Sequence, residues 1–167
     1  MISLTVSVSE TLYCVSMKGK VTTILFVIAV LGLFDALFLT YKHFTHSVPP
    51  CQVNYIFSDC GRVLNGPYAT MLNIPTAVWG VVYYSFVLLI ISLGQRMHRK
   101  MYSTLLVAVT TGGFFFSAYF VFLQLVIIRA VCLYCMVSAF LCTMLFILSI
   151  VNKQMNRYAG AYLEFLE

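Results

Sequence analysis

The chain has 167 residues, of which 62% are hydrophobic and only 9% are charged, and its net charge is +5. A soluble protein needs roughly a quarter to a third of its exposed positions charged, so this composition excludes a soluble globular fold. The longest run of Lys and Arg is Arg99-Lys100, which argues against nucleic acid as a partner. The chain is therefore predicted to be an integral membrane protein whose surroundings are the lipid bilayer.

The first 16 residues contain no basic side chain, whereas Lys18 and Lys20 follow Met17 and directly precede an apolar run. That pattern is typical of the start of a bacterial membrane protein. Residues 1–16 are therefore expected to be an extension, either mis-assigned or disordered. Residues 17–152 are expected to form one four-helix domain, and residues 153–167 a cytoplasmic tail.

Four apolar segments are long enough to cross a membrane, because a hydrocarbon core about 30 Å thick takes about 20 helical residues. The predicted transmembrane helices cover residues 21–41, 75–94, 102–128 and 131–151. The predicted fold class is an all-α membrane protein, a four-transmembrane-helix bundle with an extracytoplasmic loop between its first two helices.

The Lys and Arg residues predict the orientation, since short cytoplasmic loops hold an excess of them. Those before the first helix, between the second and third, and after the fourth share one side of the membrane. The opposite side has only Lys42, Arg62 and Arg129. We therefore expect a multi-pass protein of the cell membrane with both termini in the cytoplasm.

Four cysteines fall on the extracytoplasmic side of this topology. Cys51 and Cys60 lie in the long first loop, and Cys132 and Cys135 open the last helix. Cysteines in a first helical turn meet unpaired backbone N–H groups and the positive end of the helix dipole, which stabilise a thiolate. A redox-active pair is predicted there, and the loop pair can exchange with it through a mixed disulfide.

Two other interpretations of these cysteines stay open. The pairs could be inert staples, although closing a loop as small as Cys132-x-x-Cys135 removes little entropy from the unfolded chain. All four could also bind zinc, but a Cys-x8-Cys spacing is loose for half of a zinc site, so no metal is predicted. The alternative function is a non-enzymatic four-helix membrane module with structural or metal-binding external cysteines.

Electrons that reach Cys132 and Cys135 need an acceptor, and the sequence has no nucleotide-binding or haem-attachment motif. A quinone, reached laterally from the bilayer, fits a pair whose helix continues into hydrocarbon. Ser138 shares a helix face with Cys135 and is a candidate quinone contact. Asp35 is a second candidate, either as a proton relay or as a hydrogen-bond partner of the quinone, because a carboxylate at membrane depth is expensive. A structural alternative is that Asp35 reaches the headgroups or pairs with Lys42.

Two further groups of residues are expected to be structural. Trp79, Tyr83 and Tyr84 are interpreted as interfacial and packing residues. The small residues of the third helix are interpreted as a close-packing face for a neighbouring helix: Ala108, Gly112, Gly113 and Ser117.

The order of these motifs resembles the vitamin K epoxide reductase family in its bacterial and archaeal form. The residues that carry the resemblance are "GLFDALFLTYKHF", "CGRVLNGPYATMLNIPTAVWGVVYY" and "VCLYC". DsbB-type proteins, by contrast, place the helix-borne Cys pair before the loop pair. The resemblance implies a four-helix bundle around a quinone, menaquinone or ubiquinone. It also implies that a thioredoxin-like, DsbA-type protein is reoxidised for disulfide formation in exported proteins.

Carried over residue by residue, the resemblance makes Cys51 and Cys60 the shuttle that takes electrons from the partner. Cys132 exchanges with a loop cysteine, and Cys135 faces the quinone. Many family members have a Ser at the position of Gly66, for which the neighbouring Asn65 is the expected substitute.

The chain also departs from the animal members of the family, which have an Asn where Thr76 stands and a Tyr where Ala139 stands. Reduction of vitamin K epoxide is therefore not expected. Some bacterial members carry a fused thioredoxin-like domain, and none precedes Glu167. The thiol partner is accordingly expected to be a separate protein.

Overall fold

The computed structural model describes residues 2–45, 63, 70–71, 74–94 and 99–164, with side chains described between residues 19 and 157. Its long helices are α1 (Ile2–Phe44), α3 (Thr76–Leu93), α4 (Arg99–Phe122) and α5 (Leu133–Glu164). A π-helical turn, η1 (Leu123–Ile128), continues α4. Two short strands, β1 (Thr70–Met71) and β2 (Ile74–Pro75), pair antiparallel immediately before α3.

Each long helix contains a stretch that is long and apolar enough to cross a membrane. These stretches are Gly19–Phe44, Thr76–Leu93, Lys100–Ile128 and Leu133–Arg157. Within the described residues, the prediction of an all-α, four-helix membrane protein is thus confirmed.

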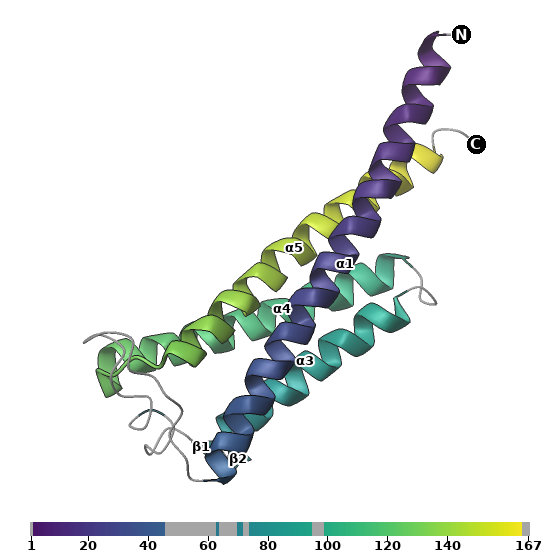
Figure 1. Ribbon diagram of the computed structural model, residues 1–167. Helices are drawn as coiled ribbons and strands as arrows, with labels where there is room; N and C mark the ends of the chain where they lie inside the picture. The colour runs from purple at the N-terminus through teal and green to yellow at the C-terminus, as the bar shows by residue number, and fades with distance from the viewer. Residues whose placement is uncertain (1, 46–62, 64–69, 72–73, 95–98, 165–167) are drawn as a thin grey trace.

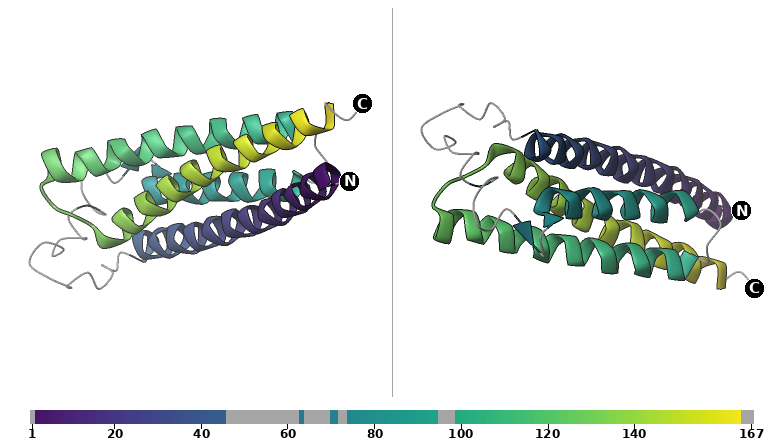
Figure 2. Two further views of the ribbon diagram at one scale, coloured as in Figure 1. Left: turned by 90° about the horizontal axis from the view of Figure 1, so that it is seen from above. Right: turned by 90° about the horizontal axis from the view of Figure 1, so that it is seen from below.

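The helices form a ring in which α1 packs against α3 and α5, and α4 packs against α5. Contact between α3 and α4 closes the ring but is less extensive than the other three. Figures 1 and 2 show both ends of the chain at one end of the bundle, where α3 ends and α4 begins. The strands, η1 and the start of α5 gather at the opposite end.

Two helices run further than their apolar segments. α1 has 43 residues, about 65 Å at 1.5 Å per residue, and its backbone is already helical over residues 2–16, which sequence analysis assigned to an extension. α5 continues past residue 151 to Glu164. Neither helix contains a proline, the residue that interrupts a helix most strongly.

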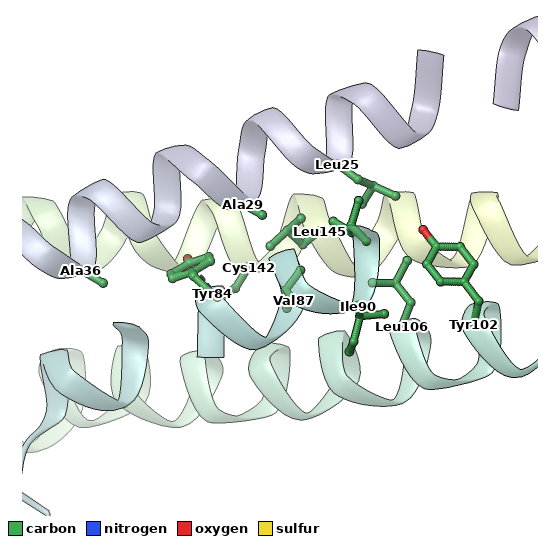
Figure 3. Packing of buried hydrophobic residues seen from close by; sticks show 11 residues of the cluster. Leu25, Ala29, Ala36, Tyr84, Val87, Ile90, Tyr102, Leu106, Cys142 and Leu145 are labelled. Carbon is green, nitrogen blue, oxygen red and sulfur yellow. Dashed lines mark hydrogen bonds between the residues drawn. The ribbon is translucent and has the colours of Figure 1, made fainter. Parts of the chain in front are cut away.

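The core of the bundle lies between the four helices, and small residues allow large ones to enter it. Tyr84 of α3 is 1% exposed, and its ring fills the space beside Gly32 of α1, where an added Cβ would overlap it. Figure 3 shows how this side chain lies among Ala36, Ala29 and Cys142. Because lipid provides no hydrophobic driving force between helices, such close packing holds them together.

Candidate redox site

The connection from α4 to α5 is a tight left-handed cap at the end of η1. Arg129 has φ 52° and ψ 35°, a conformation that few non-glycine residues adopt. The carbonyl of Gln124 accepts the N–H of Arg129 and, at 3.2 Å, the N–H of Ala130, and these bonds close the end of the π-helical turn. This cap reverses the chain direction between η1 and α5, and Cys132 lies immediately before the first residue of α5.

Cys132 and Cys135 lie together at the N-terminus of α5. Cys132 immediately precedes the first helical residue, is fully buried, and contacts Val63, Tyr134 and Cys135. Its carbonyl accepts the N–H of Met136 at 3.1 Å. Both thiols are free, and Cys135 packs against Cys132, as the members of a pair that forms and breaks a disulfide must.

The Cys132 thiol lies just outside the membrane-spanning stretch of α5. The hydrogen bond with the Cys135 thiol, helped by the N–H groups of Cys135 and Tyr134, holds the pKa of Cys132 below its usual value. Burial and the nearby Asp35 carboxylate oppose this lowering without cancelling it. The pair thus lies at a helix start, and a lowered pKa favours the thiolate of Cys132; its redox role stays a prediction.

Gln124, the second residue of η1, is a site residue that sequence reasoning missed. Its side chain is 2% exposed, and its Oε1 accepts the backbone N–H of Cys132 at 3.1 Å. The same side chain lies near the Cys135 thiol. The available signal was a carboxamide within an otherwise apolar segment, where a polar group is expensive.

A cavity of 430 Å³ lies between the helices, and Cys135 forms part of its wall while Cys132 does not. This volume is within the range of small-molecule and cofactor sites. The other polar groups that line it are contributed by α3, α4, η1 and α5: Thr76, Tyr83, Tyr84, Ser117, Gln124 and Ser138. The structure therefore brings Ser138 and Cys135 to one ligand-sized space.

The cavity reaches the outside of the bundle between α3 and α4. Exposed residues of both helices contribute to its wall, namely Trp79 of α3 with Gly112 and Phe116 of α4. This is also where the two helices pack least closely. Cys135 therefore lines a cavity whose wall is partly exposed between α3 and α4.

A hydrogen-bonded cluster closes the inner wall. The Tyr84 hydroxyl lies 3.2 Å from both the carbonyl and the Oγ of Ser138, and 3.3 Å from the Sγ of Cys142. The ring of Tyr83 meets that of Tyr84 edge-on, with centroids 5.0 Å apart. Tyr84 does pack, as the sequence predicts, but it lies in the core, and the sequence gives no sign that both tyrosines line a cavity.

Asp35 occupies a different position from the other candidates. It is not among the residues that line the cavity, although its neighbour Ala36 is. Its Oδ2 is buried without a hydrogen-bond partner among the described residues. The Lys42 ammonium lies 5.6 Å from the centroid of the Phe38 ring. The role of Asp35 as a proton relay or quinone contact stays a prediction.

The remaining predicted residues, Cys51, Cys60 and Asn65, lie outside the described residues. The loop shuttle therefore stays a prediction, and so does its zinc-binding alternative. In the part of the chain that the structure describes, no group of three or more His, Cys, Asp or Glu side chains could hold a metal ion.

Comparison with known proteins adds two findings. The profile of the vitamin K epoxide reductase family matches residues 23–150. An Arabidopsis thaliana protein, thiol-disulfide oxidoreductase LTO1, is 34% identical over 131 residues, which cover 74% of this chain and 34% of that protein. The chain thus spans about a third of the length of this relative.

Proposed function

Since this chain belongs to the vitamin K epoxide reductase family, we propose that it is a thiol oxidoreductase that passes electrons to a membrane quinone. The observation that carries the proposal is the placement of the two helix-borne cysteines. Cys132 is buried outside the cavity wall, whereas its partner Cys135 lines the cavity. One thiol of the pair is thus positioned for exchange and the other for contact with a bound molecule.

The electrons enter through the loop. Cys51 and Cys60 take two electrons from a separate thioredoxin-like, DsbA-type protein, whose dithiol becomes a disulfide. The loop pair then reduces the Cys132–Cys135 disulfide by exchange at Cys132, and Cys135 delivers the electrons to menaquinone or ubiquinone. The two protons released by the partner dithiol equal the two that the quinone takes up, so the overall reaction is balanced.

The cavity supports a lipid-soluble acceptor. Its wall is mostly apolar, with a few hydroxyl, thiol and amide groups on one side, as is usual for sites that orient an apolar ligand. Access between α3 and α4 lets a quinone headgroup reach Cys135 from the bilayer. Ser138 and Tyr84 are the hydroxyls placed to orient that headgroup.

The distribution of charge supports an orientation with the cysteine pairs outside. Figure 1 shows the start of α1, the start of α4 and the end of α5 at the same end of the bundle. Arg99 and Lys100 begin α4, Lys20 lies in the first half of α1, and Lys153 and Arg157 lie in the last third of α5. Lys42 and Arg129 lie at the cysteine end. By the excess of positive charge in cytoplasmic loops, the termini are cytoplasmic and the cysteine pairs face the oxidising side of the cell membrane.

The proposal is tested by the visible absorbance of single-cysteine variants with bound quinone. Cys132→Ser leaves Cys135 unpaired beside the quinone, and a thiolate in contact with an oxidised quinone gives a charge-transfer band that fades on acidification. Cys135→Ser should show no band. A band in Cys135→Ser alone would reverse the two roles, and no band in either variant with quinone bound would count against direct contact.

Thiol trapping on the wild-type protein distinguishes this function from the structural alternative. Thiol trapping should show that a reduced thioredoxin-like protein exchanges with the four external cysteines and that quinone is consumed. Four cysteines that are permanently blocked, or that release zinc on treatment with a thiol-modifying reagent, would instead identify a non-enzymatic module.

A further inference from the structure

Gln124 touches both cysteines of the redox pair, although it lies on a different helical segment. Its Oε1 accepts the backbone N–H of Cys132 at 3.1 Å, and its side chain lies near the Cys135 thiol. It also lines the cavity at 2% exposure. The carboxamide of Gln124 is therefore adjacent to the backbone of Cys132, to the side chain of Cys135 and to the cavity.

The hydrogen bond to Cys132 fixes which way this carboxamide points. A Gln side chain has one oxygen that only accepts and one NH₂ group that only donates. Because the oxygen faces the N–H of Cys132, the NH₂ group is the part that is left to donate to the sulfur of Cys135. The N–H of Cys132, the residue immediately before α5, has no partner within the helix, so the oxygen acts as its cap.

The backbone around Gln124 is built to hold it there. The residue lies in a π-helical turn, a feature frequent at functional sites because it offsets side chains from the regular helical register. Its carbonyl accepts the N–H of Ala130, which closes the left-handed turn at Arg129. Gln124 is thus bonded through both its backbone and its side chain to the segment that leads into α5.

We propose that Gln124 is a positioning residue that stabilises Cys135 as the leaving thiolate when Cys132 forms a mixed disulfide with the loop. In that step a loop thiolate attacks the sulfur of Cys132, a new S–S bond forms, and the Cys132–Cys135 bond breaks. Cys135 leaves with the electron pair as a thiolate, and no proton moves. This inference rests on the proposed function, because the electron pair on Cys135 is the one that the quinone then accepts.

A neutral hydrogen-bond donor at this position can stabilise the Cys135 thiolate, which the neighbouring ionisable groups do not. The ionisable groups that interact with Cys135 are Cys132 at the end of its own helix and Asp35 on α1, and Tyr83, Tyr84 and Cys142 line the same cavity. Each of these is neutral or negative, and a negative neighbour disfavours a thiolate. The NH₂ group of Gln124 contributes a stabilising hydrogen bond where the described side chains place no cation.

The test measures the thiolate of Cys135 directly, without quinone or partner, so it stays informative if quinone coupling fails. In a Cys132→Ser background, alkylation of Cys135 by iodoacetamide is followed by mass spectrometry across pH. Adding Gln124→Met, which keeps the volume but removes the donor, should slow alkylation about tenfold at pH 7 and move the pH profile up by about one unit. Gln154→Met makes the same chemical change at an exposed site on α5 and should leave the profile unmoved.

Two outcomes would overturn the proposal. If Gln124→Met alkylates Cys135 at the unaltered rate with an unmoved profile, Gln124 does not donate to the thiolate and is only a structural cap. If Gln124→Met does not fold, Gln124→Leu decides, because it also has no N–H to donate and adds no charge beside the thiolate. An unmoved profile in that variant refutes the proposal, and a profile moved to higher pH supports it.

Discussion

The adjacent glycines of α4, Gly112 and Gly113, differ in what a methyl group would meet, and this difference allows a sharp test of the cavity wall. A Cβ added at Gly113 would overlap the ring and hydroxyl of Tyr83, whereas a Cβ at Gly112 has nothing within 4 Å. Sequence analysis interpreted both as one close-packing face. In the structure only Gly113 has a close neighbour from another helix, and both line the cavity.

The expected magnitude follows from two terms. Replacing Gly by Ala in a helix interior stabilises by about 1 kcal/mol, and this gain is common to both positions. Overpacking a well-filled site costs about 1–3 kcal/mol, and only Gly113→Ala incurs this cost. The two variants should therefore differ by about 1–3 kcal/mol in the free energy of unfolding, with Gly112→Ala the more stable.

The assay is thermal unfolding of both variants in the same detergent, combined with the KM for quinone. A displaced Tyr83 ring encroaches on the cavity, so Gly113→Ala should also raise the KM. Tyr83→Leu in the Gly113→Ala background should recover most of the lost stability, since it removes the group that the methyl meets. Equal stability of Gly112→Ala and Gly113→Ala, within about 0.5 kcal/mol, would refute the assigned contact between Gly113 and Tyr83.

Three further expectations concern the cysteine end and the topology. Arg129→Gly should raise the free energy of unfolding by about 1 kcal/mol, because glycine adopts the left-handed conformation without the cost to a side chain; a loss of stability would argue against that conformation. Because the pKa of Cys132 is lowered, its thiolate persists below the pH at which an ordinary thiol is protonated. Alkylation of reduced Cys132 should therefore stay fast to lower pH than for free cysteine, and Cys135→Ala should move its profile back up. Ser47→Cys should be labelled from outside intact cells and His98→Cys only after permeabilisation; the reverse result would place the cysteine pairs in a reducing compartment.

The fold class could be predicted from the sequence because length and hydropathy alone decide how often a chain can cross a bilayer. The position of Cys132 and Cys135 at the start of the last helix was accessible for the same reason, since Arg129 interrupts the apolar run just before them. These are properties of segments, and neighbouring residues in the chain determine them. No tertiary contact is needed to infer them.

The surroundings of the cysteines could not be predicted in the same way. Gln124 reaches Cys132 only because η1 departs from α-helical register and Arg129 turns the chain through a left-handed cap. Tyr84 lies in the core only because α1 has a glycine opposite its ring. Both contacts depend on how one helix is rotated against another, and no local pattern in this sequence encodes that rotation.

The sparse packing between α3 and α4 also determines which part of a bound molecule the protein recognises. A molecule that reaches Cys135 through this seam leaves any long hydrocarbon tail among the acyl chains, outside the 430 Å³ cavity. The cavity then recognises the headgroup alone, so the protein should use quinones that share a ring but differ in isoprenoid length equally well. Under the proposed function, exchange of oxidised for reduced quinone becomes diffusion in the plane of the bilayer, and the membrane itself serves as the reservoir.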